Sequence, residues 1–278
     1  MNKNATVSIV IPCYNNQDTI VETLDSIKNQ DFTNFEIIIV NDGSKDNSEQ
    51  IIKEYINTTS LKIEVINQEN SGPSFARNNG ATKASGKYLL FIDADDKIAP
   101  TYISECLDVF KNKSNAIIVY SEIELFEAET GKWELKDFKL PDFLINNCIP
   151  ICGMMETSKF KELGGFDLNI SFTEDWELWI RFVEKYGEGV FKIPKPLFFY
   201  RKRNNQNSLT DTKGHNEYGE KCRLYIYNKH YDFYRKNGLN LETLFETRYK
   251  YFKIHKKYYN IWYKKLFTSL KKIISNKK

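Results

Sequence analysis

Residues 87–96 read Lys-Tyr-Leu-Leu-Phe-Ile-Asp-Ala-Asp-Asp. Residues 88–92 form an unbroken apolar run, which is typical of a strand buried on both faces. Three carboxylates, Asp93, Asp95 and Asp96, follow this run directly. Like charges at a strand end repel one another and resist burial unless a positive partner lies among them. A hard divalent cation such as Mg²⁺ or Mn²⁺ suits these oxygen ligands, and a solvated acidic turn is the alternative.

Strands and helices alternate along the chain before this run. The apolar patterns predict strands over 6–12, 35–40 and 61–66 and helices over 19–30, 47–56 and 71–83. Asp18 is suited to cap the first of these helices. Such alternation predicts an α/β fold with a mostly parallel sheet flanked by helices, in which ligands bind beyond the carboxyl ends of the strands. Tyr14, Asn15, Asp42 and residues 93–96 all fall at that edge.

The second half of the chain is less regular. We expect helices over 101–111, 156–163 and 174–186, one strand or a bent pair over 116–126, and a strand over 197–201. Thr173 is suited to cap the helix that ends at Tyr186. Pro194 and Pro196 are expected to break the chain before the last strand. The pattern over residues 133–150 predicts neither a helix nor a strand.

The composition indicates an ordinary globular protein. The 278 residues are 41% hydrophobic and 28% charged, and no run approaches the ~18–20 apolar residues of a membrane span. The first residues show no signal-peptide pattern, so we expect none. The five cysteines lack the second close pair that a zinc site needs. We therefore expect buried thiols in a reducing cytoplasm.

Charge is unevenly distributed along the chain. Residues 217–278 carry 16 Lys and Arg against 5 Asp and Glu, whereas the rest carries 24 against 32. From Asn240 onward, apolar residues recur at helical spacing beside lysines. This basic tail is either a helical extension that packs on the rest of the chain or on a second copy in a homodimer, or an interfacial helix attracted to anionic lipid. No motif for nucleic-acid recognition accompanies the charge, so we expect no nucleic-acid partner.

Three polar side chains near the predicted edge have two interpretations each. Tyr14 and Asp42 either stack a base and accept its N–H, or belong to plain turns. Arg77 lies on the helix that follows Gly72, so it either points toward the same edge or lies in solvent.

Two charged stretches in the second half are equally ambiguous. Glu174 and Asp175 begin a predicted helix, where they either cap it or supply a general base. Residues 201–203 are three cations in a row. These cations either balance a diphosphate or form a solvated strand edge.

Seven stretches of the chain fall in the order and spacing of a known family. They are residues 10–15, 39–44, 72–78, 91–96, 164–167, 174–178 and 200–201 with Ser208. Together they resemble the family-2 inverting glycosyltransferases of the GT-A fold, with a Rossmann-like nucleotide-binding half. The resemblance covers roughly residues 5–210 and implies a nucleotide-sugar donor and a Mn²⁺ or Mg²⁺ ion.

Carried over by position, this resemblance gives the residues specific roles. The donor nucleotide would contact Pro12, Tyr14, Asn15, Asp42, Arg77, Asp93, Ala94 and Asp95. The metal would be held by Asp95, Asp93 and Asp96, and the diphosphate by Arg201 and Arg203. Asp175 would be the catalytic base, with Glu174 and Trp176 on the acceptor side. Many relatives have His where this chain has Arg203, so a fixed cation stands in place of one metal or diphosphate ligand.

The implied activity is metal-dependent, inverting transfer of a hexosyl or N-acetylhexosaminyl group, from UDP-sugar by preference, to a glycan or lipid-linked glycan in cell-surface polysaccharide synthesis. Such an enzyme would work in the cytoplasm or at the inner face of the membrane. We expect a catalytic domain over 1–215, with a nucleotide-binding half over 1–100 and an acceptor half over 101–215, and a helical tail over 216–278. A non-catalytic nucleotide-sugar binder and a nucleotidyltransferase are the alternatives.

Overall fold

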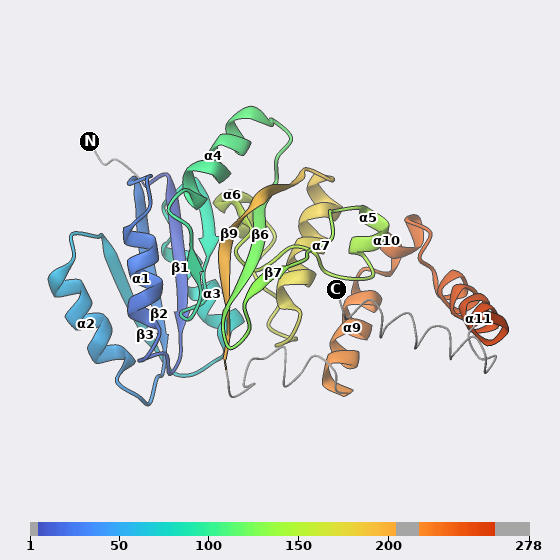
Figure 1. Ribbon diagram of the computed structural model, residues 1–278, viewed down its shortest axis with the longest axis horizontal. Helices are drawn as coiled ribbons and strands as arrows, with labels where there is room; N and C mark the ends of the chain where they lie inside the picture. The colour runs from blue at the N-terminus through green and yellow to red at the C-terminus, as the bar shows by residue number, and fades with distance from the viewer. Residues whose placement is uncertain (1–4, 204–216, 259–278) are drawn as a thin grey trace, which may run out of the picture. The chain divides into compact units, whose positions relative to one another are not determined.

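The computed structural model of the protein describes residues 5–203 and 217–258 (Figure 1). The chain divides into two compact units, Met1–Ile226 and Tyr227–Lys278. The predicted domain boundary at residue 215 lies outside the described residues, as does Ser208.

The first unit begins with a parallel half-sheet. Strands β1 (Val7–Cys13), β2 (Phe35–Asp42), β3 (Ile63–Gln68) and β4 (Tyr88–Phe91) lie side by side in the order β3-β2-β1-β4. Strands β1, β2 and β4 are almost fully buried because helices cover both of their faces. These strands confirm the α/β alternation that the sequence predicts.

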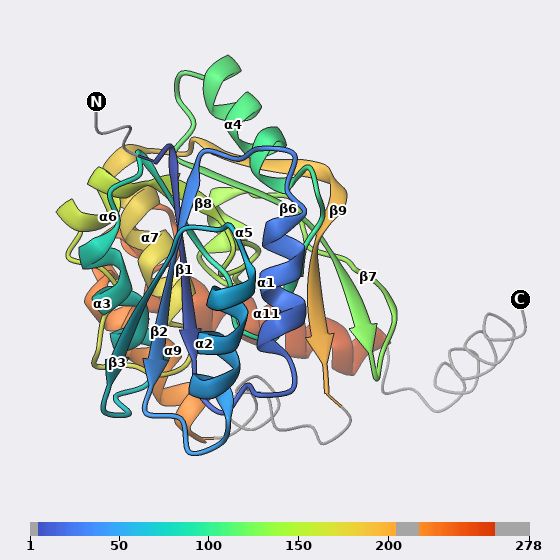
Figure 2. The same ribbon diagram turned by 90° about the vertical axis from the view of Figure 1, so that its left-hand side faces the viewer.

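Side-chain alternation along the strands decides which helix lies on which face. Helices α1 (Ile20–Lys28), α2 (Ser48–Thr58) and α4 (Tyr102–Asn112) pack on the face that carries Ile9 and Ile37. Helix α3 (Pro73–Lys83) covers the opposite face, as Figure 2 shows. Gly80 allows this helix close to the sheet, because a Cβ atom there would lie 2.5 Å from Val10.

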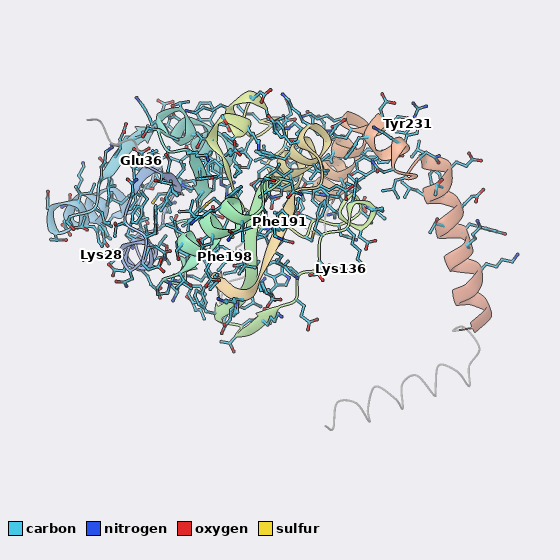
Figure 3. The ribbon with its side chains drawn as sticks, turned by 90° about the horizontal axis from the view of Figure 1, so that it is seen from above. Lys28, Glu36, Lys136, Phe191, Phe198 and Tyr231 are labelled. Atoms are coloured by element: carbon cyan, nitrogen blue, oxygen red, sulfur yellow. The ribbon has the colours of Figure 1, made fainter. Side chains whose placement is uncertain are left out.

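The second half of the sheet is mixed in direction. Strand β8 (Met154–Glu156) runs antiparallel between β4 and β6 (Ile118–Glu127), and β9 (Val190–Lys202) runs parallel to β6. Two short strands, β5 (Lys97–Ile98) and β7 (Gly131–Trp133), pair with β9 and β6. In Figure 3 the labelled Phe191 and Phe198 of β9 lie among the side chains in the middle of this unit.

The expected break at Pro194 and Pro196 is wrong, because β9 continues through both prolines. The pairing of β6 with β9 shifts register on either side of Glu122, where Ser121 pairs with Ile193 and Glu122 with Pro196. A strand tolerates proline where an irregularity removes the need for a ladder N–H. The prolines therefore lie at an irregularity of the strand and do not end it.

Helices α5 (Leu140–Phe143), α6 (Thr157–Glu162) and α7 (Glu174–Tyr186) complete the first unit with most of α9 (Glu217–Lys229). The expected side-chain caps are absent at both helix starts. Thr19, and not Asp18, is the residue before α1, and its hydroxyl donates to the Ala94 carbonyl at 2.9 Å. Thr173 has a left-handed backbone with φ 60°, and its hydroxyl donates to Phe172 O.

The second unit contains the end of α9, α10 (Tyr231–Lys236) and α11 (Leu241–Tyr258). Leu241, Phe245 and Tyr249 of α11 are exposed. The predicted apolar stripe beyond residue 258 lies outside the described residues. Among the helices that the structure describes, none is long and apolar enough to cross a membrane.

Candidate active site

The turns that follow β1 and β2 meet at the carboxyl edge of the sheet. Figure 2 shows β1, β2 and β9 ending at the lower edge of the view. Asn15 has φ 54°, its N–H donates to Ser44 Oγ at 3.1 Å, and its Oδ1 accepts the Lys45 N–H at 2.7 Å. Tyr14 is 45% exposed beside it. The aromatic side chain of Tyr14 is therefore accessible at this edge, and hydrogen bonds fix the neighbouring Asn15.

Asp42 ends β2 and fixes the turn that leads into α3. Its Oδ1 accepts the Ser71 N–H and the Gln68 side-chain amide, both at 2.8 Å, and its Oδ2 accepts the Gly72 N–H at 2.9 Å. A carboxylate oxygen can accept two hydrogen bonds, so Oδ2 retains acceptor capacity. Asp42 is only 3% exposed, and its contact with a base stays a prediction.

Arg77 of α3 joins two stretches that are far apart in the sequence. Its Nη2 donates to Asp93 Oδ1 at 2.7 Å, and its Nη1 donates to Glu174 Oε1 at 2.9 Å. Arg77 is buried, and within the described residues its Nε has no hydrogen-bond partner. The side chain that was predicted to reach a base or solvent is thus committed to two carboxylates.

Asp175 lies beside this ion-pair network at the first turn of α7. Its Oδ1 accepts the Trp176 backbone N–H at 2.7 Å, and its Oδ2 accepts Nδ2 of Asn147 at 3.1 Å. Burial, followed by the charge of Glu174, raises the pKa of Asp175 to about 7. A carboxyl group with this pKa changes its protonation state close to neutral pH.

Glu174 and Trp176 do not lie on an open acceptor surface. Glu174 is 8% exposed and paired with Arg77, and Trp176 is 5% exposed. The indole N–H of Trp176 donates to Phe143 O at 2.9 Å, and that of Trp179 donates to Ile149 O at 3.1 Å. These two hydrogen bonds connect residues 143–149 to the helix that carries Asp175. The sequence pattern did not predict a secondary structure for this segment.

The carboxylates of Asp93 and Asp95 are partly accessible at the edge of the sheet. Asp95 Oδ2 accepts Nη2 of Arg203 at 2.7 Å, and the Asp93 and Asp95 side chains are 31% and 25% exposed. Burial, then the charge of Asp93, raises the pKa of Asp95, so the nearby cations do not fully offset the negative charge. Mg²⁺ and Mn²⁺ accept one or two protein carboxylates and fill the remaining positions with water and phosphate oxygens. The oxygens of Asp95 and Asp93 fit such an ion.

Asp96 does not join this pair. It is 1% exposed, its Oδ1 accepts the Arg201 backbone N–H at 2.9 Å, and its Oδ2 has no partner among the described residues. Burial, followed by the charges of Asp95 and Asp93, raises its pKa well above the usual range. In the described part of the chain no three His, Cys, Asp or Glu side chains converge as a metal site. Asp96 as a third metal ligand stays a prediction, and its burial does not support it.

Arg201 is also committed within the protein. Its Nε donates to the Asp95 carbonyl at 2.8 Å, and its Nη atoms pair with Glu22 and Glu127. Only 9% of its side chain is exposed, whereas 32% of the Arg203 side chain is. Of the two arginines predicted to hold a diphosphate, Arg203 is the one that is accessible.

Two further predicted contacts involve backbone rather than side-chain groups. Pro12 pairs with Val40 in the sheet, one residue before the buried Cys13. Ala94 is 2% exposed, and its carbonyl accepts the Thr19 hydroxyl. Both residues lie at the edge and help fix its shape.

The fold and its edge define an α/β protein of the GT-A class. The model of the family described as "Glycosyl transferase family 2" matches residues 8–164, which is more than half of the chain. The chain therefore belongs to glycosyl transferase family 2, as the resemblance predicted.

Similar proteins are found in several bacteria. A Rickettsia typhi protein described as an uncharacterized glycosyltransferase is 32% identical over 192 residues, covering 64% of this chain and 58% of that protein. YibD of Escherichia coli, also described as an uncharacterized glycosyltransferase, is 44% identical over 101 residues, covering 36% of this chain and 29% of YibD. This chain therefore spans less than two thirds of the length of these relatives.

Solved structures confirm the predicted fold class. Staphylococcus aureus TarS 1–349 in complex with UDP has a TM-score of 0.60 at 22% identity, covering 84% of this chain and 74% of that one. The mannosyltransferase PcManGT of Pyrobaculum calidifontis, in complex with GDP-Man and Mn²⁺, has a TM-score of 0.60 at 18% identity, covering 77% and 62%. At these identities the likeness shows the fold.

Proposed function

We propose that this chain is an inverting glycosyltransferase that uses a divalent cation and moves a sugar from a nucleotide-sugar donor to a hydroxyl of a glycan or lipid-linked glycan. One observation carries the proposal. Arg77 pairs with Asp93 at the carboxyl end of β4 and with Glu174, the neighbour of Asp175. These two ion pairs support a single site for the donor-side carboxylates and the candidate base.

Each residue of the site has a stated role in this proposal. Tyr14 stacks the base, Asp42 accepts its N–H, and Arg203 contacts the diphosphate. Asp95, with Asp93, would hold the cation, which when bound neutralises charge on the leaving diphosphate.

Asp175 supplies the base in this scheme. It takes the proton of the acceptor hydroxyl while that oxygen attacks the anomeric carbon from the face opposite the diphosphate, which inverts the carbon. A pKa of about 7 suits this role, because the group is then a usable base at neutral pH. No other carboxyl group at the edge is needed for the proton transfer.

The structural neighbours support the donor class. TarS is in complex with UDP and with UDP-GlcNAc, and PcManGT with GDP-Man and Mn²⁺. We retain UDP-linked hexose or N-acetylhexosamine as the preferred donor, and cell-surface polysaccharide synthesis at the cytoplasmic face of a membrane as the setting. The excess of Lys and Arg over residues 217–278 is consistent with a peripheral site of action.

A panel of nucleotide sugars tests the proposal. Donor binding by calorimetry and release of nucleoside diphosphate should both require Mn²⁺ or Mg²⁺, and Asp95→Ala should abolish the metal-dependent part. Asp108→Ala changes an exposed carboxylate on α4 and serves as the matched control. Unchanged donor affinity in excess EDTA would remove the cation from the proposal. Donor binding without turnover would support the non-catalytic alternative, and pyrophosphate release would support the nucleotidyltransferase.

A further inference from the structure

Residues 143–149 contact the start of α7 through three hydrogen bonds. Two of them use backbone carbonyls, which accept the indole N–H groups of Trp176 and Trp179. Any residue type supplies a carbonyl, so these two bonds place few demands on the sequence of the segment. The third bond joins the side chains of Asn147 and Asp175 at 3.1 Å, and it requires a side-chain donor at position 147.

The Asn147 amide has a defined orientation. Its Oδ1 accepts the Ile149 backbone N–H at 3.0 Å, so the opposite end of the amide, Nδ2, faces Asp175. An N–H that points at a carboxylate favours the ionised form and restricts rotation of the carboxyl group. Because the Trp176 N–H binds the other oxygen, both oxygens of Asp175 are held while each keeps acceptor capacity for a proton.

We propose that Asn147 is a positioning residue for the base: its amide orients Asp175 and favours the carboxylate that accepts the proton of the acceptor hydroxyl. This inference rests on the proposed function. The charged groups that face Asp175 from the surrounding elements are Glu174 on α7, Arg77 on α3 and Asp93 after β4. Two of these three carry negative charge and oppose ionisation of Asp175. The Asn147 amide acts in the opposite direction without adding a buried charge.

The variant Asn147→Asp separates this role from a purely structural one. Aspartate keeps an oxygen for the Ile149 N–H, so the turn retains its hydrogen bond, but the donor to Asp175 is lost and a like charge replaces it. Asn146→Asp is the matched control, because it adds the same charge one residue away on an exposed side chain. Asn147→Ala removes the donor without adding charge and serves as the second variant if the first fails to fold.

Two measurements apply to these variants. The first is the titration of the Asp175 carboxyl carbon by ¹³C NMR, assigned by its absence in Asp175→Asn. In Asn147→Asp the titration midpoint should rise by about one pH unit or more, in Asn147→Ala by less, and in Asn146→Asp not measurably. The second is the pH profile of kcat, which should shift in the same direction, with kcat at pH 7 lowered about fivefold or more and the donor KM within about twofold.

A titration midpoint in Asn147→Asp and Asn147→Ala equal to that of the wild type overturns the inference. Equal loss of kcat in the Asn147 and Asn146 variants also overturns it. The NMR titration needs no turnover, so it still decides whether Asn147 acts on Asp175 if the wild-type chain transfers no sugar. That last result would instead contradict the proposed function.

Discussion

Replacement of Asp175 by Asn removes the group that we propose as the base and keeps the size of the side chain. Asparagine still offers one oxygen to the Trp176 N–H, so the start of α7 retains that hydrogen bond. Loss of a general base commonly lowers the rate ~10²–10⁴-fold and largely spares substrate binding. We expect Asp175→Asn to bind the donor with wild-type affinity and to transfer sugar at no more than about one hundredth of the wild-type rate.

The pH dependence of the wild-type chain gives the same group a second signature. With the pKa of Asp175 at about 7, roughly one tenth of the molecules carry the carboxylate at pH 6 and roughly nine tenths at pH 8. The transfer rate should therefore rise almost tenfold per pH unit below pH 6 and about fivefold between pH 6 and pH 7, and it should level off above pH 8. The residual rate of Asp175→Asn should lack this rise.

Stability should change in the opposite sense to activity. The pKa of Asp175 is about 7 in the folded chain against 3.8 as the ordinary value, so ionisation costs the folded state roughly 4 kcal/mol more than the unfolded one. The folded state binds the proton more tightly, so wild-type stability falls as pH rises from about 4 to about 7. Asparagine never ionises, so Asp175→Asn avoids this cost and should be about 1–3 kcal/mol more stable than wild type at pH 8. The gain is smaller than the full cost because the new amide fits less well beside Asn147. At pH 4 this advantage should disappear.

The assay combines initial transfer rates from pH 5.5 to 9, donor binding by calorimetry, and urea denaturation at pH 4 and pH 8. Asp108→Asn makes the same chemical change on the exposed side of α4 and should match the wild type in all three. Near-normal transfer by Asp175→Asn would refute the assignment of the base. A wild-type rate that does not change between pH 5.5 and 7.5 would refute the ionisation that we assign to it.

Three further outcomes are expected. Arg77→Ala leaves the buried Glu174 and the partly exposed Asp93 without their cation, so urea denaturation should show a loss of about 3–5 kcal/mol, against less than about 0.5 kcal/mol for the exposed Lys83→Ala on the same helix. Arg203→Ala should weaken nucleoside diphosphate binding in calorimetry much more than nucleoside binding, and equal losses would exclude Arg203 from the diphosphate site. A chain that ends at Asn240 should keep donor hydrolysis and lose salt-sensitive binding to anionic vesicles; failure of this chain to fold would show instead that the tail packs on the protein.

Local patterns predicted the parallel half of the sheet because buried strands and amphipathic helices leave regular signatures in the sequence. Residues 88–92 and the turn after β2 are examples, and the structure brings the polar residues that follow these strands to the carboxyl edge. Residues 143–149 left no signature because they contact α7 through single hydrogen bonds that have no sequence period. Pro194 and Pro196 misled the prediction because they lie where β9 has extra residues relative to β6, and this irregularity depends on the pairing of the two strands.

The roles of charged residues were the least predictable part of the site. The sequence shows three adjacent aspartates, but only the tertiary structure shows that Asp96 turns inward while Asp93 and Asp95 face different arginines. Partner choice of this kind depends on contacts between distant segments, and each partner decides which carboxylate is available. The spacing of residues in the sequence therefore identifies the acidic cluster, but it does not assign a separate role to each aspartate.

The buried guanidinium of Arg77 explains how two acidic stretches coexist at one edge. Asp93 and Glu174 would repel each other there, and Arg77 places a donor between them and a positive charge within reach of both. Arg77 belongs to α3, whose preceding turn is fixed by Asp42 through the Ser71 and Gly72 N–H groups. Helix α3 thus links Asp42, which was predicted to accept a base N–H, to Glu174, which precedes Asp175.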